Sequence, residues 1–130
     1  MTPIETSIQA ALVRHPEIRL AILFGSLAAG EERLDSDVDL AIDAGRLFDG
    51  ASKMLLMAEI AECTGRPVDL VDLGAIGEPL LGQILKYGKR ILGKDSVYAE
   101  LIKRHLFDEA DFMPCYRGIL RERRNAWIGK

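Results

Sequence analysis

Two short apolar runs constrain the fold of this chain most strongly, and the segment between them starts with a glycine–serine pair and ends with two closely spaced aspartates. The first run, Leu20 to Phe24, has the length and composition of a buried strand, and Gly25 ends it. Glycine permits a sharp turn and lets an anion approach the backbone. Ser26 can then cap a helix beginning with Leu27 to Ala29, whose N-terminus would favour a phosphate. The stretch therefore predicts a strand followed by a phosphate-binding turn.

The second apolar run begins with Asp37-Val38-Asp39 and continues to Ile42, so it also reads as a strand. Because side chains alternate along a strand, Asp37 and Asp39 lie on one face. Neighbouring carboxylates repel each other unless they share a cation, and oxygen ligands of this kind suit Mg²⁺ bound jointly with substrate phosphates. The two runs together predict a phosphate-binding turn beside a metal-binding pair of carboxylates.

This order of residues resembles the signature of the DNA polymerase beta-like nucleotidyltransferases, and the short chain resembles their minimal nucleotidyltransferase branch from about Ala21 to about Arg123. Members of that branch are commonly antitoxins whose partner is a HEPN-domain ribonuclease toxin. The resemblance implies a polymerase beta-like α/β fold with a small mixed sheet of about four strands and flanking helices. It also implies a single nucleotidyltransferase domain over residues 1–130, with C-terminal helices from about 96 to 127.

The same resemblance implies that AMP is transferred from ATP to a tyrosine hydroxyl of the toxin by a mechanism that uses two Mg²⁺ ions. Asp37 and Asp39 would bind the metals, and Gly25 and Ser26 would hold the β and γ phosphates. Residues 53, 89 and 90 are basic candidates for the pyrophosphate, and the sequence does not choose between them.

A third acidic residue on the neighbouring strand completes the metal site in the resembled family, and Val68-Asp69-Leu70 matches that position. Asp69 lies in the middle of a predicted strand, where a carboxylate is costly unless it meets a cation or a hydrogen-bond donor. Asp72 lies near the strand end, where a solvated carboxylate is ordinary. We therefore prefer Asp69 as catalytic and metal-binding residue, and Asp72 remains the alternative.

Two other functions stay open. The chain could transfer a nucleotide to a small hydroxylated molecule such as an aminoglycoside, although 130 residues leave no space for the additional helical domain that such members usually carry. It could also be a non-catalytic antitoxin that masks its toxin by binding. The intact set of acidic residues argues against that second alternative, because clustered carboxylates destabilise a fold that does not use them.

Apolar periodicity and turn residues predict the remaining elements. In the helix over Ala51 to Thr64, the recurring apolar residues are Met54, Met57, Ala58 and Ala61. We expect the helices to pack on one face of the sheet, with the acidic residues on the other face or at its edge. The predicted elements are helices over Ile4–Val13, Ala51–Thr64, Pro79–Tyr87, Ser96–Phe107 and Cys115–Trp127, and strands over Ile18–Phe24, Val68–Leu73 and, at a sheet edge, Lys89–Leu92.

Charge and composition exclude several classes. Lys and Arg total 17 against 20 Asp and Glu, so strong direct binding of nucleic acid is not expected. No apolar run is long enough for a membrane span, and the N-terminal residues lack the pattern of a signal peptide. We therefore expect a cytoplasmic protein. Cys63 and Cys115 lack the spacing of a zinc site and are expected to be reduced.

Overall fold

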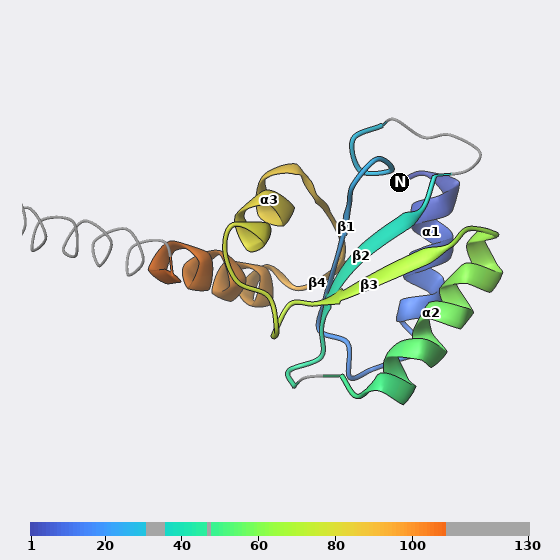
Figure 1. Cartoon of the computed structure of the whole chain (residues 1–130), viewed down its shortest axis with the longest axis horizontal. Coiled ribbons are helices and arrows are strands. Elements are labelled where there is room, and N and C mark those ends of the chain that lie inside the picture. Colours follow the sequence, from blue (N-terminus) through green and yellow to red (C-terminus); the bar gives the residue numbers. More distant parts are fainter. Residues whose placement is uncertain (31–35, 47, 109–130) are drawn as a thin grey trace, which may run out of the picture.

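A four-stranded mixed sheet forms the centre of the computed structural model, which describes residues 1–30, 36–46 and 48–108 (Figure 1). β1 pairs antiparallel with β2 and β4, whereas β2 and β3 run parallel and are joined by a helix. The predicted mixed sheet of four strands is therefore confirmed, with the last strand at an edge. The strands are β1 (Leu20–Phe24), β2 (Val38–Asp43), β3 (Val68–Asp72) and β4 (Lys89–Gly93), in the spatial order β3-β2-β1-β4.

The first three helices begin and end close to their predicted positions, and the fourth begins one residue before its predicted start. The Thr2 side chain accepts a hydrogen bond from the Glu5 N–H and caps the first helix, and Asp49 caps the second in the same way. Gly65, with a φ of 68°, ends the second helix. The predicted helix over residues 115–127 lies outside the described residues. The helices are α1 (Pro3–Leu12), α2 (Gly50–Thr64), α3 (Leu80–Tyr87) and a fourth over residues 95–108.

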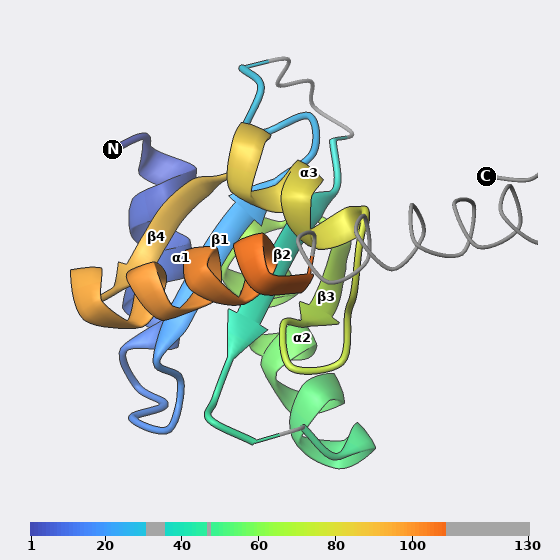
Figure 2. The same cartoon turned by 90° about the vertical axis from the view of Figure 1, so that its left-hand side faces the viewer.

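Helices cover both faces of the sheet, so the expectation that they would pack on one face is wrong. Figure 1 shows α1 and α2 on one side, and Figure 2 shows α3 and residues 95–108 lying across the other. The cause is the central strand β1, which is apolar on both faces. Ala21 and Leu23 pack in the core under α1 and α2, whereas Leu20 and Ile22 pack in the core under α3. A strand buried on both faces needs cover on each.

The buried face of α2 also differs from the expected one. Leu56 and Ile60, one helical turn apart, are buried against α1 and the sheet. Met54 is 71% exposed and Ala58 is also exposed, while Met57 packs at the margin of the core. Because α2 has apolar residues on more than one side, its sequence pattern did not identify the face that packs.

The segment after β1 forms a turn where the sequence predicted a helix. The Ala29 N–H donates to the Gly25 carbonyl at 3.1 Å, and the Gly30 N–H donates to the Leu27 carbonyl at 3.4 Å. Gly30 has a φ of 76°, which takes the chain out of helical geometry after this one turn. A phosphate here would therefore meet individual backbone and hydroxyl groups of a turn, without the dipole of a long helix.

Candidate active site

The register of the two parallel strands places Asp39 and Asp69 side by side. These residues are direct partners in the β2–β3 ladder, where neighbouring strands are about 4.8 Å apart. Both lie on the sheet face that carries α3, because the alternate residues Ala41 and Val71 belong to the core on that face. Asp37 is exposed one residue before β2 begins. All three lie at the end of the sheet where β2 and β3 begin.

Mutual repulsion marks these carboxylates as a charged cluster. The pKa of Asp39 is raised above its ordinary value, first by burial and then by the negative charges of Asp69 and Asp37. Asp39 is half-buried, while Asp37 and Asp69 are exposed. A bound cation would remove the cost of ionising Asp39 next to two like charges. The cluster is therefore suited to a positive ligand.

Gly25 gives the Asp39 carboxylate room to lie against the backbone. Phe24, the last residue of β1, is the ladder partner of Asp39, so the chain turns directly beside this aspartate. Gly25 has a φ of +76°, and a Cβ built on it would lie 3.1 Å from Asp39 Cγ and would overlap Oδ2. Ser26 follows in the turn with a half-buried side chain. The predicted phosphate-binding pair and the predicted metal ligands thus lie at one end of the sheet.

Asp72, the alternative third carboxylate, lies at the other end of β3. Its Oδ2 accepts a hydrogen bond from the Phe48 N–H at 2.8 Å, and its Oδ1 accepts one from the Gly74 N–H at 2.8 Å. Asp72 pairs with Ile42, three residues along the ladder from Asp39. This position and these bonds give Asp72 a role in holding two loops, which favours Asp69 as the partner of Asp39.

Two of the three basic candidates for the pyrophosphate belong to the other side of the sheet. Lys53 is on α2, and Lys89 Nζ lies 3.7 Å from Glu5 Oε2 on α1. Arg90 lies 4.6 Å above the Tyr98 ring, and its Nη2 is 2.7 Å from Asp95 Oδ1. Lys89 thus contacts α1, and Arg90 contacts the helix over residues 95–108.

Sequence reasoning missed Arg66, which contacts the segment carrying the aspartates. Its Nη1 donates a hydrogen bond to the Ser36 carbonyl at 3.0 Å. Arg66 and Ser36 are 30 residues apart in the chain. Its position two residues before a strand with an aspartate was the one available signal, and this position does not reveal the hydrogen-bond partner.

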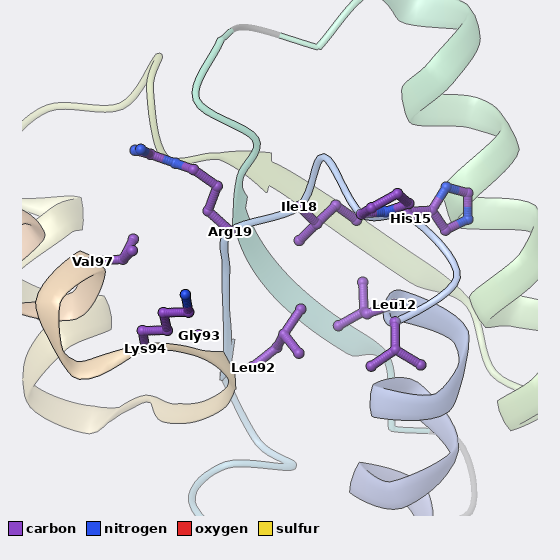
Figure 3. Close-up of a pocket in the computed structure, with 10 residues that line it drawn as sticks. Leu12, His15, Ile18, Arg19, Leu92, Gly93, Lys94 and Val97 are labelled. Atoms are coloured by element: carbon purple, nitrogen blue, oxygen red, sulfur yellow. The ribbon is translucent and has the colours of Figure 1, made fainter.

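A separate cavity of about 490 Å³ opens at the opposite end of the sheet (Figure 3). Leu12, Ile18 and Leu92 form much of its apolar wall, and Arg19 and Lys94 lie at its border. None of the predicted site residues lines it. The acidic cluster is therefore distinct from this cavity.

The acidic cluster fits Mg²⁺ in its donor chemistry. In the part of the chain that the structure describes, no three His, Cys, Asp or Glu side chains are arranged so that they alone could hold a metal ion. Mg²⁺ usually binds to one or two carboxylates and takes its other ligands from water and substrate phosphates. The ladder pair Asp39 and Asp69 provides such carboxylates, and the missing Cβ of Gly25 makes room for the Asp39 carboxylate.

A mixed sheet with paired aspartates beside a glycine–serine turn defines a nucleotidyltransferase architecture. Residues 6–97 match the polymerase beta nucleotidyltransferase family, and the chain belongs to this family. Among the described residues, no helix has both the length and the apolar character needed to cross a membrane.

The relatives of this chain include a curated enzyme and solved toxin–antitoxin structures. Protein adenylyltransferase MntA of Shewanella oneidensis is 33% identical over 78 residues, which are 60% of this chain and 56% of that relative. A crystal structure of a toxin–antitoxin with AMP-PNP matches with a TM-score of 0.77 and 25% identity over 91% of this chain and 96% of its own. A mutant of the toxin–antitoxin MntA–HpeT matches with a TM-score of 0.75 and 25% identity over 91% of this chain and 95% of its own.

Proposed function

We propose that this protein is an antitoxin that transfers AMP from ATP to a tyrosine hydroxyl of a HEPN-domain ribonuclease toxin. The observation that carries the proposal is the ladder pair Asp39 and Asp69 beside the Gly25 turn in a chain of the nucleotidyltransferase family. Similarity to a protein adenylyltransferase supports a protein as the acceptor. Similarity to a toxin–antitoxin crystallised with AMP-PNP supports a toxin as the partner and ATP as the nucleotide. We place the reaction in the cytoplasm, where ATP and a ribonuclease toxin would both be found.

In the proposed reaction, the tyrosine oxygen attacks the α-phosphorus of ATP, and the bond to the β-phosphate oxygen breaks to release pyrophosphate. Two Mg²⁺ ions, held by Asp37, Asp39 and Asp69, would neutralise the triphosphate and lower the pKa of the attacking hydroxyl. Asp69, the exposed member of the ladder pair, would accept the hydroxyl proton. Gly25 and Ser26 would hold the β and γ phosphates through a backbone N–H and the hydroxyl.

Intact-mass analysis tests this function directly. The purified protein is incubated with Mg²⁺ and α-labelled ATP, with and without the product of the adjacent gene. We expect the partner to gain the mass of AMP, and Asp39→Asn to abolish the gain. Asp43→Asn is the matched control, because Asp43 lies on the same strand face at the far end of β2, where it pairs with Arg19.

Other outcomes would replace the proposal with one of the alternatives. Transfer to a hydroxylated small molecule, with none to the partner, would assign a small-molecule nucleotidyltransferase. A tight complex with the partner and no transfer to any acceptor would assign an antitoxin that acts by masking. Wild-type transfer by Asp39→Asn would remove the metal-binding role of this residue.

A further inference from the structure

Arg66 lies where the connection between α2 and β3 meets the segment that leads into β2. Gly65 ends α2 in the left-handed region with a φ of 68°, and this turns the chain so that Arg66 and Pro67 run toward β3. Arg66 is half-buried. Its guanidinium donates to the carbonyl of Ser36, a residue that is only 8% exposed.

Arg66 and Pro67 together hold the backbone on both sides of Asp37. Arg66 Nη1 donates to the Ser36 carbonyl at 3.0 Å, and the Pro67 carbonyl accepts from the Val38 N–H at 2.8 Å. These two backbone groups belong to the residues immediately before and after Asp37. The hydrogen bond that the Pro67 carbonyl accepts lies at the start of the β2–β3 ladder, in which Val38 pairs with Val68. The hydrogen bond that the Arg66 side chain donates connects the two segments at Ser36, a residue that lies before the first ladder pair.

The attachment opposes the repulsion within the acidic cluster. Asp37 is exposed and precedes β2, so regular strand pairing does not hold it, while its charge acts on Asp39. Without a cation, like charges push Asp37 away from the ladder pair. A guanidinium remains charged at every relevant pH and offers several donors in a fixed plane. Arg66 can therefore fix the local backbone through its bond to the Ser36 carbonyl.

We propose that Arg66 is a positioning residue that holds the Ser36–Val38 segment so that Asp37 reaches the same metal-binding site as Asp39 and Asp69. This inference deepens the proposed nucleotidyl transfer and rests on it. Arg66 touches neither substrate nor metal in this role and acts through the backbone next to Asp37.

The test compares Arg66→Gln and Arg66→Lys with the wild-type chain. The matched control is Arg19→Gln, because Arg19 Nη2 lies 3.0 Å from Asp43 Oδ2, at the end of β2 that is far from Asp37. Three properties are measured: amide hydrogen exchange of Val38 and Leu23 without metal, Mn²⁺ affinity by electron paramagnetic resonance, and AMP transfer to the partner.

For Arg66→Gln we expect Val38 to exchange about tenfold faster while Leu23 in β1 keeps its rate, which is the pattern of local opening. We expect weaker Mn²⁺ affinity and slower transfer in the same variant. Arg66→Lys should recover part of each loss, since lysine keeps the charge and a donor. Arg19→Gln should match the wild type in Val38 exchange and Mn²⁺ affinity.

Two results would overturn the inference. Wild-type Val38 exchange and Mn²⁺ affinity in Arg66→Gln would show that the bond to Ser36 does not position the cluster. Equal acceleration of exchange at Val38 and Leu23 would show that Arg66 stabilises the whole fold. If the wild-type protein binds Mn²⁺ but modifies no partner, the proposed function fails while the exchange and Mn²⁺ measurements still decide the role of Arg66.

Discussion

Replacing Gly25 by alanine tests whether the close approach of the backbone to Asp39 matters for the reaction. The substitution has two separable effects. The first is backbone strain, because a φ of +76° costs an L-residue about 1–2 kcal/mol relative to glycine. The second is a clash between the new Cβ and the Asp39 carboxylate. The clashing atoms are the end of a half-buried side chain, which can rotate away at little cost to the fold. The second effect should therefore appear in the chemistry more than in the stability.

Gly30→Ala is the matched control for this substitution. Gly30 has the same φ of +76°, and no atom of the described residues lies within 4 Å of a Cβ built on it. Both variants should lose about 1–2 kcal/mol of stability, which lowers Tm by several degrees in a chain of this size. Transfer should fall about 100-fold in Gly25→Ala, as a displacement of a reacting group by about 1 Å commonly does. Gly30→Ala should transfer at close to the wild-type rate.

The measurements are thermal unfolding followed by circular dichroism and the rate of AMP transfer from intact masses. If Gly25→Ala transfers AMP as fast as Gly30→Ala, the contact between Gly25 and Asp39 has no part in the reaction. If Gly25→Ala loses far more stability than Gly30→Ala, the carboxylate is held too firmly to rotate. In that case the division into strain and clash is wrong.

The other predictions concern the carboxylates. Asp69→Asn should reduce AMP transfer at least about 100-fold without loss of Tm, whereas Asp72→Ala should cost about 1–3 kcal/mol of unfolding free energy by removing two backbone hydrogen bonds and should keep the rate. The reverse pattern would make Asp72 the metal ligand. Because the folded pKa of Asp39 is raised from 3.8, its contribution to stability is present below that value and is lost as pH rises through the raised pKa. Asp39→Asn should therefore raise Tm at pH 7 without Mg²⁺, and the gain should shrink when Mg²⁺ is added or pH approaches 3.8. A lower Tm for Asp39→Asn in titrations of Tm against pH would contradict this account.

The choice between Asp69 and Asp72 shows how far local pattern reaches. Side-chain alternation along β3 places Asp69 and Asp72 on opposite faces of the sheet, because the two residues are three positions apart. Which face carries the site depends on the pairing of Asp69 with Asp39, and that pairing comes from the parallel register of β2 and β3. Residue spacing within one strand contains no information about the register of another.

The buried faces of α2 and β1 also depended on packing that the local sequence pattern does not contain. The sequence located α2 correctly but suggested Met54 and Ala58 for its apolar face, and the structure buries Leu56 and Ile60. Helical periodicity identifies a set of faces, and the neighbouring α1 and sheet select one of them. Similarly, an apolar β1 indicated a buried strand, but the need for helices on both faces follows from its central place between β2 and β4.

The sequence by itself determined the elements whose causes are local: the strand before Gly25, the strand that contains Asp39, and the helix ends at Thr2 and Gly65. These features follow from backbone geometry, side-chain alternation and capping within a few residues. Only the tertiary structure decided that Asp69 lies beside Asp39, that Gly25 makes room for that carboxylate, and that Arg66 bonds to Ser36. Each of these contacts joins segments far apart in the chain, so its geometry depends on strand register and packing across the whole sheet.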